Sequence, residues 1–416
     1  MRELYYINMI TLTIFSVCLA YQGFYVIVSL FKKQKKFKSK KNHRYAVIVS
    51  ARNESGVITQ LIESIKWQKY PKKLIDIFVV ADNCTDNTAD VARKAGAIVY
   101  ERFNKIEVGK GYALDYLFSK IKKDYAHKNY EGYIIFDADN IADENYVAEM
   151  NNVFDNGYNV VTSYRNSKNF TESWISSGYS LWFLKEARYL NNPRMTLKTS
   201  CAVSGTGFLV STKTIDSIGG WKFFTLTEDI EFTFNRVVNG DLIGYAEDAI
   251  FYDEQPTSFD VSIKQRSRWI KGAMQVVAKY SVSILKKMFQ TGDMSSYDMF
   301  MNTVPTMVIG CIGLFSNVFI MLFEILTKAH LLIVLGTLAH MFFNTYITVA
   351  LLAVLIVITE RKRIKATKLE LIKSILTFPL FVSTYVIAFF VAVFKDVKWE
   401  PIPHKASFKA NAMKKS

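Results

Sequence analysis

The stretch Tyr133-Ile134-Ile135-Phe136-Asp137-Ala138-Asp139 joins a continuous apolar run to two acidic residues. Four consecutive apolar residues are typical of a strand that is buried on both faces of a sheet. Similar β-branched runs occur at 46–49, 77–80 and 159–162, separated by segments with helical periodicity. This alternation predicts a mostly parallel sheet covered by helices on both faces, a Rossmann-like α/β domain, over residues 45–254.

Acidic residues end two of these predicted strands. Asp82 follows the run at 77–80, and Asp137 and Asp139 follow the run at 133–136. Ligands of open parallel sheets bind beyond the carboxyl ends of the strands. A D-x-D pair can direct two carboxylates into one crevice, where Mg²⁺ or Mn²⁺ takes carboxylate oxygens together with substrate phosphates. Each aspartate taken alone is equally compatible with a cap on the following helix.

Two further motifs carry charge suited to chemistry. The segment Val108-Gly109-Lys110-Gly111 places a lysine between glycines, which suits a diphosphate but also describes an ordinary loop. The segment Thr225-Leu226-Thr227-Glu228-Asp229 precedes a helical pattern and predicts carboxylates in the positive first turn of a helix. A carboxylate there can accept a proton from an attacking hydroxyl. The alternative is a capping box between Thr225 and Glu228.

Apolar segments long enough to cross a bilayer flank the predicted α/β domain. Residues 6–31 are mostly apolar and are followed by a basic stretch from Lys32 to Arg44, which predicts an uncleaved anchor over residues 1–31 with its lysines in the cytoplasm. Three more segments lie at about 303–326, 331–358 and 372–394, within residues 301–395. The chain is therefore predicted to be a multi-pass protein of a bacterial plasma membrane with a cytoplasmic α/β domain.

The formal net charge of +15 is concentrated beside these apolar segments. Basic residues at such positions favour an anionic lipid leaflet as the partner over nucleic acid. Residues 262–288 combine apolar residues at helical spacing with lysines and arginines, which predicts an interfacial amphipathic helix within residues 255–300. An ordinary surface helix of the α/β domain is the alternative.

The last apolar segment leaves the membrane topology open. Arg361-Lys362-Arg363 places the preceding junction inside the cell. If all three segments cross, the short basic tail at 396–416 would lie outside, in conflict with the positive-inside rule. Alternatively, one segment is interfacial or re-entrant, with Pro379 as the break.

The motifs together resemble a known family. Asp82, Asp137-Ala138-Asp139, Thr227-Glu228-Asp229 and Gln265-Arg266-Ser267-Arg268-Trp269 occur in the order and spacing of the processive family 2 glycosyltransferases. That group contains the cellulose and β-glucan, chitin, hyaluronan and poly-N-acetylglucosamine synthases. The resemblance covers about residues 47–271 and implies a GT-A fold.

The resemblance also implies roles for individual residues. Asp137 and Asp139 would hold the nucleotide and a Mg²⁺ or Mn²⁺ ion, with Asp139 as the direct ligand, and Lys110 would meet the diphosphate. The catalytic residues would be Asp229, as the base, and Glu228. The uridine part of the donor would be held by Ala51, Asn53, Glu54 and Asp82.

The acceptor side would be built from two other motifs. Gly205 and Thr206 belong to a loop near the acceptor end, Gln265 and Arg268 would support the leaving diphosphate, and Trp269 would stack on the acceptor sugar. An aromatic face suits the C–H faces of sugars, and a guanidinium suits a diphosphate.

The implied reaction is inverting transfer from a UDP-sugar to the end of a growing polysaccharide. The loop containing Gly205 favours UDP-glucose and a 1,4- or mixed-linkage β-glucan, secreted through the protein's own transmembrane channel, with accessory secretion subunits as further partners. The alternatives are a chitin-like synthase using UDP-N-acetylglucosamine, a non-processive polyprenyl-phosphate glycosyltransferase, and a binding or transport protein. The short tail departs from cellulose synthases with a cyclic-di-GMP-binding domain. Their gating-loop motif is absent as well, although residues 398–404 could serve similarly if they lie inside the cell.

Overall fold

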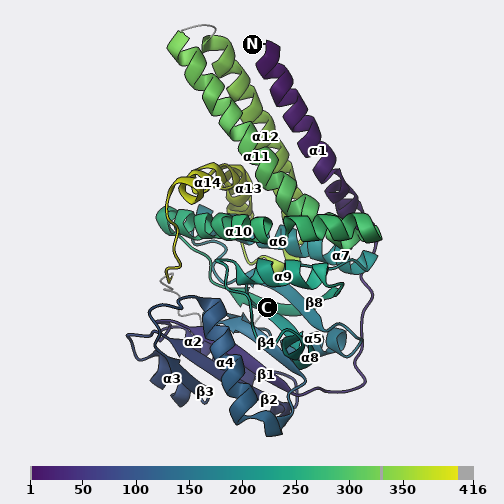
Figure 1. Ribbon diagram of the computed structural model, residues 1–416, viewed down its shortest axis with the longest axis vertical. Helices are drawn as coiled ribbons and strands as arrows, with labels where there is room; N and C mark the ends of the chain where they lie inside the picture. The colour runs from purple at the N-terminus through teal and green to yellow at the C-terminus, as the bar shows by residue number, and fades with distance from the viewer. Residues whose placement is uncertain (1, 328–330, 402–416) are drawn as a thin grey trace.

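The computed structural model describes residues 2–327 and 331–401 (Figure 1). An α/β domain lies at one end of the molecule. Three long helices, α1 (Arg2–Phe31), α11 (Met294–Thr327) and α12 (Leu331–Thr359), project from the other end, and α11 contacts both α1 and α12. The domain and the projecting helices thus occupy opposite ends of the protein.

One sheet of eight strands forms the centre of the α/β domain, in the order β3-β2-β1-β4-β7-β6-β8-β5. Its strands are β1 (Tyr45–Ala51), β2 (Ile75–Asp82), β3 (Ile98–Arg102), β4 (Gly132–Asp137), β5 (Ile141–Ala142), β6 (Val160–Ser167), β7 (Phe208–Ser211) and β8 (Ile243–Asp253). The strands predicted at 46–49, 77–80, 133–136 and 159–162 are all observed, as β1, β2, β4 and β6.

The two halves of the sheet differ in strand direction. Strands β1 to β4 pair in parallel, as predicted. In the other half, β7 is antiparallel to both β4 and β6, and β5 is antiparallel to β8, whereas β6 and β8 are parallel. The sheet is therefore mixed. The sequence pattern missed β3, β5, β7 and β8. The strands β5 and β7 have only two and four residues, and such short runs carry little periodicity.

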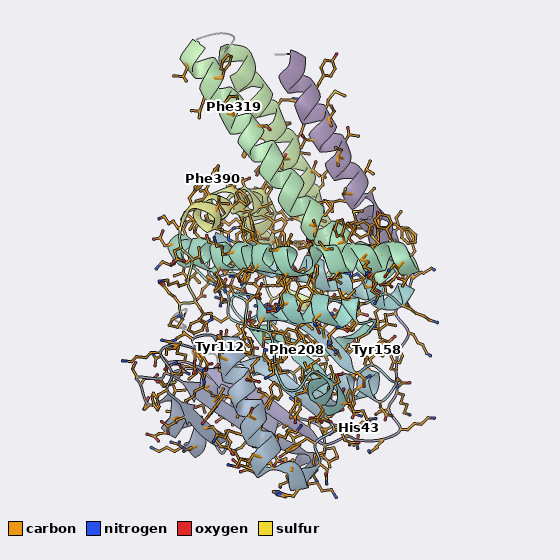
Figure 2. All side chains as sticks on the ribbon, viewed as in Figure 1. His43, Tyr112, Tyr158, Phe208, Phe319 and Phe390 are labelled. Carbon is orange, nitrogen blue, oxygen red and sulfur yellow. The ribbon has the colours of Figure 1, made fainter. Side chains whose placement is uncertain are left out.

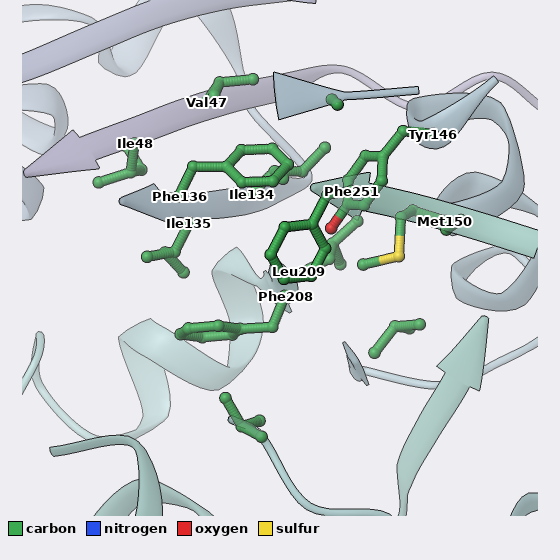
Figure 3. Packing of buried hydrophobic residues seen from close by; sticks show 14 of the residues in the cluster. Val47, Ile48, Ile134, Ile135, Phe136, Tyr146, Met150, Phe208, Leu209 and Phe251 are labelled. Atoms are coloured by element: carbon green, nitrogen blue, oxygen red, sulfur yellow. The ribbon is translucent and has the colours of Figure 1, made fainter. Parts of the chain in front are cut away.

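Part of the core surrounds β4, which lies between β1 and the second half of the sheet (Figure 3). Ile134, Ile135 and Phe136 are fully buried on β4. The ring of Phe136 lies 5.0 Å from that of Tyr146 and 5.9 Å from that of Phe251, measured between ring centres. Burial of apolar strand residues and of such rings stabilises the sheet and holds the carboxyl ends of β4 and β8 together.

The helices that connect the strands pack around the sheet. The amphipathic helix α2 (Ile58–Lys66) buries Ile58, Leu61, Ile62 and Ile65, which lie on one face at helical spacing. The other helices of the domain are α3 (Thr88–Lys94), α4 (Lys110–Asp124), α5 (Tyr146–Phe154), α8 (Thr212–Ser217) and α9 (Glu228–Val238).

A layer of helices separates the α/β domain from the projecting helices (Figure 1). It contains α6 (Trp174–Glu186), which continues through a π-helical turn into α7 (Asn192–Leu197), and α10 (Phe259–Thr291), which contains the helix predicted at 262–288. The layer also contains α13 (Lys368–Ser383) and α14 (Tyr385–Phe394).

The N-terminal half of helix α10 is hydrogen-bonded to α13 and α14. Nη1 of Arg266 donates to the carbonyl of Phe381 at 3.1 Å, and Oγ of Ser267 donates to that of Ala388 at 3.0 Å. Nζ of Lys271 donates to the carbonyl of Ala392 at 3.2 Å. Since Arg266 and Ser267 are buried in these contacts, α10 is an internal element of the helical layer and not an isolated surface helix.

Both ends of the α13–α14 segment contact the α/β domain. Before it, the guanidinium of Arg363 lies 3.9 Å from the ring centre of Tyr164. After it, the ring of Trp399 lies 5.1 Å from the guanidinium of Arg52. This geometry favours the interfacial or re-entrant alternative for the last apolar segment. The predicted break at Pro379 is wrong, because this proline lies inside α13 and the helices separate at Thr384.

Three stretches within the described residues are long and apolar enough to cross a membrane, namely Met9–Phe31, Phe342–Thr359 and Lys368–Phe394. The projecting helices carry apolar side chains that face outward, such as Phe319 on α11, which is 70% exposed (Figure 2). Exposed apolar side chains on long helices suit contact with lipid. The crossing predicted for 303–326 remains a prediction.

A buried ion pair anchors the projecting helices to the layer below. Arg194 on α7 donates from Nε to Oδ2 of Asp298 at 2.6 Å and from Nη2 to Oδ1 at 2.9 Å. The hydroxyls of Tyr21 and Tyr25 on α1 also donate to this carboxylate, each at 2.9 Å. Asp298 is thereby fully satisfied although it is completely buried.

Candidate active site

A cavity of about 1110 Å³ opens at the carboxyl ends of β1, β2 and β4 and continues toward the projecting helices. All of the residues predicted for the site line this cavity except Asn53 and Thr206. The lining residues among them are Ala51, Glu54, Asp82, Lys110, Asp137, Asp139, Gly205, Glu228, Asp229, Gln265, Arg268 and Trp269. The fold thus brings together motifs that are far apart in the sequence, while the role of each residue remains a prediction.

Asn53 and Thr206 hold neighbouring loops in place. Asn53 has a left-handed backbone with φ of 59°, and its Oδ1 accepts a hydrogen bond from the backbone N–H of Thr85 at 2.8 Å. Oγ1 of Thr206 accepts from the backbone N–H of Asp137 at 2.8 Å and donates to Oδ1 of Asn140. Thr206 is 2% exposed, so its contacts stabilise the D-x-D turn from behind.

The helix-cap alternatives for the aspartates are wrong. After Asp82 the next helix begins at Thr88, whose N–H is bound by Asp86, and after Asp139 the next helix begins at Tyr146. Asp82 instead accepts a hydrogen bond from Nη1 of Arg102 at 2.7 Å, and both side chains are buried. Its carboxylate is therefore fixed at the wall of the cavity.

Lys110 links the D-x-D turn to the start of α9. Its Nζ donates to Oδ1 of Asp137 at 2.5 Å and to the carbonyl of Gly205 at 2.7 Å, and it lies 3.8 Å from Oε1 of Glu228. Lys110 begins α4, and Gly111 beside it approaches the backbone of Phe223 so closely that a Cβ would lie 2.1 Å from that carbonyl oxygen. The glycine therefore permits the contact between α4 and the loop before α9.

Helix α9 begins at Glu228, so the carboxylates of Glu228 and Asp229 lie in its first turn, as predicted. The capping-box alternative is wrong, because the cap residue is Thr227 and its side chain makes no cap hydrogen bond. Burial raises the pKa of Glu228 to about 7, although Lys110 opposes the shift, and burial also raises the pKa of Asp229. A carboxylate with a raised pKa is suited to accept a proton near neutral pH.

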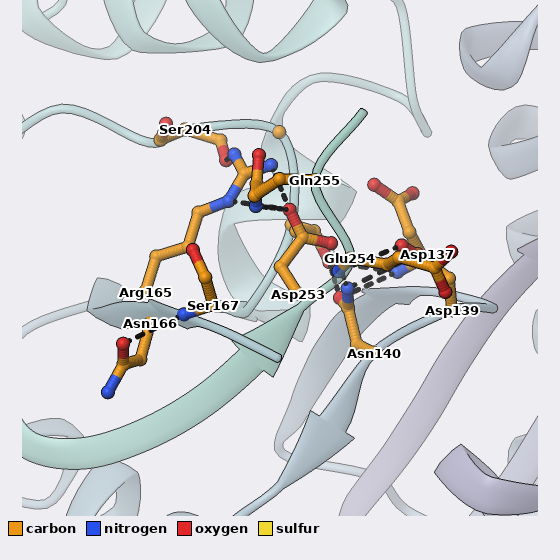
Figure 4. Close-up of polar contacts among 12 residues, drawn as sticks. Asp137, Asp139, Asn140, Arg165, Asn166, Ser167, Ser204, Asp253, Glu254 and Gln255 are labelled. Atoms are coloured by element: carbon orange, nitrogen blue, oxygen red, sulfur yellow. Dashed lines mark hydrogen bonds and ion pairs between the residues drawn. The ribbon is translucent and has the colours of Figure 1, made fainter. Parts of the chain in front are cut away.

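A polar network behind the D-x-D turn was not predicted (Figure 4). Nδ2 of Asn140 donates to Oδ1 of Asp253 at 2.7 Å and to Oδ1 of Asp139 at 3.3 Å. Asp253 also accepts from Arg165 and from Nε2 of Gln255. Asp253 ends a strand that is parallel to β6, so the rule that identified Asp82 and Asp137 would also have identified it, had β8 been predicted.

The residues present fit a hard divalent cation in part. The described residues hold no cluster of three or more His, Cys, Asp or Glu side chains that could ligate a metal. Asp137 and Asp139 supply carboxylate oxygens from two positions of one turn, and Mg²⁺ commonly takes only one or two carboxylates, with phosphates and water filling its other positions. The pair therefore fits a metal that is completed by a nucleoside diphosphate.

The C-terminal segment reaches the part of the cavity at the carboxyl end of β1. Trp399, Glu400 and Pro401 line it together with Arg52, and Nζ of Lys264 lies 3.5 Å from Oε2 of Glu400. A gating role for residues 398–404 stays a prediction, and the residues after 401 lie outside the described part of the chain.

Aromatic side chains dominate the other end of the cavity. Trp269 contacts the rings of Tyr179 and Phe183, with centres 5.7 Å and 6.1 Å away. Trp182 stacks on Tyr385 and donates from Nε1 to Oε1 of Glu186 at 2.8 Å. Burial raises the pKa of Glu186.

Trp182 and Glu186 line the cavity but were not predicted, because α6 has no motif that distinguishes its cavity face.

These features define a GT-A α/β domain whose D-x-D turn, lysine and helix-start carboxylates share one cavity. Residues 43–272 match the family described as "Glycosyltransferase like family 2", and the chain belongs to this family.

Several curated proteins are similar to part of this chain. The chain is 26% identical over 268 residues to "Probable glycosyltransferase YdaM" of Bacillus subtilis, covering 58% of each chain. It is 25% identical to "Beta-monoglucosyldiacylglycerol synthase" of Nostoc sp., over 64% of this chain and 57% of that protein. It is 22% identical to "Poly-beta-1,6-N-acetyl-D-glucosamine synthase" of Staphylococcus aureus, over 58% and 57% respectively. The aligned part is thus less than two thirds of the length of each relative.

A solved structure shares the fold. The mannosyltransferase PcManGT from Pyrobaculum calidifontis, in complex with GDP-Man and Mn²⁺, superposes with a TM-score of 0.60 over 93% of this chain and 99% of its own. The sequence identity is 15%, so the similarity concerns the fold.

Proposed function

We propose that the protein transfers a sugar from a nucleoside diphosphate to a hydroxyl group of an acceptor, with inversion at the anomeric carbon. The observation that carries this proposal is the single cavity joining Asp137 and Lys110, at the donor end, to Asp229 and Trp269. Donor and acceptor can therefore meet beside a buried carboxylate, which in-line displacement requires.

Each part of the cavity has a role in this reaction. Asp229 accepts the proton of the attacking hydroxyl. The charges of the neighbouring Glu228 and Lys110 influence how readily Asp229 binds that proton. Arg268 and Lys110 bind the diphosphate as it leaves, since a guanidinium and an ammonium stabilise developing phosphate charge. A divalent ion held by Asp137 and Asp139 would supply further neutralisation of the leaving diphosphate.

The arrangement of helices supports a membrane location. The basic stretch from Lys32 to Arg44 runs along the α/β domain, where Lys36 pairs with Asp248 and Lys41 with Glu131. The positive-inside rule then places the domain in the cytoplasm, with α1, α11 and α12 crossing the plasma membrane. The proposed organisation is an anchor at 1–31, a GT-A domain at 45–254 and interfacial helices at 255–300. Transmembrane segments at 301–395 and a basic tail at 396–416 follow.

The finer proposal is a processive synthase that joins UDP-hexose units, with glucose favoured, into a β-linked polysaccharide and passes it through its own helices. The aromatic lining by Trp182, Trp269 and Tyr385 supports a sugar acceptor, because aromatic faces stack on sugar rings. The poly-N-acetylglucosamine relative supports a polymer but shifts the choice of donor toward UDP-N-acetylglucosamine.

A specific observation favours a lipid-linked acceptor as a second candidate. The cavity wall continues beyond the aromatic residues onto the projecting helices and α14, where it includes Thr11, Thr303, Thr345, Val386 and Phe389. An acceptor with a hydrocarbon tail could reach Asp229 along this wall from the membrane. The relative that acts in glucosyldiacylglycerol synthesis is consistent with this candidate.

One experiment tests the proposal and separates the two candidates. Purified protein in lipid with Mn²⁺ is given UDP-glucose, UDP-N-acetylglucosamine, UDP-galactose or GDP-mannose, and nucleotide release and product size are measured. We expect release with one donor, and none from Asp229→Asn, which should still bind the nucleotide. Asp90→Asn, at an exposed position on α3, is the matched control. Full activity of Asp229→Asn would remove the base assignment, while a long glycan or a single lipid-linked sugar would identify the acceptor.

A further inference from the structure

A second cavity, of about 750 Å³, lies between α8, α9 and α10. Its volume is within the range of small-molecule sites. It shares no lining residue with the first cavity. Its wall consists of Asn159, Lys213, Thr214, Ser217, Ile218, Lys222, Phe223, Asn235, Arg236, Asn239, Asp241, Lys279 and Tyr280.

The wall is rich in hydrogen-bond donors and positive charge. Four side chains are cationic, namely Lys213, Lys222, Arg236 and Lys279, whereas Asp241 is the one carboxylate of the described wall. The other polar side chains are amides and hydroxyls, which can donate as well. A phosphate group presents several acceptor oxygens and negative charge, so it matches this wall in both respects.

One of these cations, Arg236, is fixed by hydrogen bonds. Arg236 is 5% exposed, and its Nη1 donates to Oδ2 of Asp241 at 3.1 Å while its Nε donates to Oδ1 of Asn235 at 3.1 Å. Lys213 is exposed and forms no ion pair among the described residues. Lys222 lies 3.3 Å from Asp115, which does not line the cavity. The site thus combines one fixed guanidinium with two lysines that can turn toward a ligand.

Lys279 connects this cavity to the start of α9. Its Nζ donates to Oε1 of Glu231 at 2.5 Å. The other oxygen of Glu231 accepts hydrogen bonds from the backbone N–H groups of Phe224 and Thr225, each at 3.0 Å. Glu231 is 1% exposed and holds the loop that leads directly to Asp229.

We propose that the second cavity binds a ligand carrying a phosphate group and that its occupation lowers the activity of the first cavity. The phosphate competes with Glu231 for the ammonium of Lys279. Loss of that ion pair loosens the loop at Phe224 and Thr225, and with it the position of Asp229. Because α9 and α10 line both cavities, the two sites are coupled through a continuous set of contacts. The effect on rate rests on the proposed function, whereas the binding itself does not.

Binding is tested on the full chain in phosphatidylcholine nanodiscs, with the first cavity saturated by UDP and without divalent metal. In one arm, inorganic phosphate is titrated at constant ionic strength. In the other, phosphatidylglycerol replaces part of the phosphatidylcholine and phosphate is left out. The shift of the unfolding temperature is measured for the wild type and for the double variant Lys213→Ala with Lys222→Ala. A double variant of two exposed lysines on α3 and α4, Lys94→Ala with Lys123→Ala, is the control.

We expect a stabilising shift in the wild type and in the control, and an apparent affinity about tenfold weaker in the cavity variant. A response in the phosphate arm identifies a soluble phosphorylated ligand, and a response only in the phosphatidylglycerol arm identifies a lipid headgroup. No shift in either arm, or equal shifts in both double variants, would overturn the site.

The coupling is tested by UDP release in the presence of the metal and donor. The wild type should lose turnover number, with little change in the KM for the donor, as the probe that bound is added. The cavity variant should keep its basal rate and respond about tenfold more weakly. Binding with no change in turnover would overturn the coupling and leave the binding site. A protein that binds phosphate but transfers no sugar would contradict the proposed function alone.

Discussion

The replacement Glu228→Gln should make the protein more stable at alkaline pH and less active. Glu228 is 9% exposed, and burial raises its pKa from 4.5 to about 7. Between these two values the folded state binds more protons than the unfolded state, so the stability of the wild type falls as pH rises through this interval. At about 1.4 kcal/mol per pKa unit, the loss is about 3 kcal/mol and is complete above pH 7.

Glutamine is uncharged at every pH and therefore escapes this loss. For a domain of this size, about 3 kcal/mol corresponds to a difference in unfolding temperature of about 6–12 °C. The variant and the wild type should unfold at similar temperatures near pH 5, and the variant should gain that difference between pH 5 and pH 8. The assay is intrinsic tryptophan fluorescence during heating, at a series of pH values, in one detergent or nanodisc preparation.

Two further measurements make this prediction specific. Glu63→Gln, at an exposed position on α2, should unfold like the wild type at every pH, because its carboxylate remains in water. Sugar transfer by Glu228→Gln should fall by about 100-fold, since the charge next to the proposed base is lost. A temperature difference that does not change with pH, or a variant that becomes less stable as pH rises, would refute the reasoning.

Three other predictions follow from separate contacts. Removal of divalent metal by EDTA should abolish transfer, Mn²⁺ should restore it, and Asp139→Asn should require about 10- to 100-fold more Mn²⁺, as measured by nucleotide release; equal metal dependence would contradict the ligand assignment. Trp399→Ala should raise the KM for the donor about fivefold with a smaller change in turnover, because the cation–π contact with Arg52 is lost; an unchanged KM would exclude a role at the donor end. Asp298→Ala should lower the free energy of unfolding by about 3–5 kcal/mol, because Arg194 is left buried and unpaired; a loss below about 1 kcal/mol would contradict this.

The sequence pattern predicted those elements whose signal lies within a few consecutive residues. Strands β1, β2 and β4 each contain a continuous apolar run, which burial on both faces of a sheet requires, and β6 begins with the β-branched residues Val160, Val161 and Thr162. Helix α9 and the carboxylates of its first turn were likewise visible, because the helix period and its charged start occupy a few consecutive residues. The family resemblance added an expectation of how these local elements are assembled.

Contacts between distant residues could not be predicted in this way. Lys110 meets Asp137 and Glu228, Asn140 meets Asp253, and nothing in the intervening residues indicates which partner each will find. The short strand β7 was missed because four residues carry little periodicity, and its antiparallel pairing with β4 and β6 is again a contact between distant residues.

The sequence by itself therefore determined the α/β class, the apolar helices and the acidic motifs, because each depends on hydrophobic periodicity or charge over a short stretch. Only the tertiary structure decided that the α13–α14 segment starts and ends at the α/β domain, and that Trp399 reaches Arg52. The tertiary structure also decided that a second, basic cavity lies between α8, α9 and α10. These features depend on how distant segments pack, since burial and pairing energies are realised only when the chain has brought both partners together.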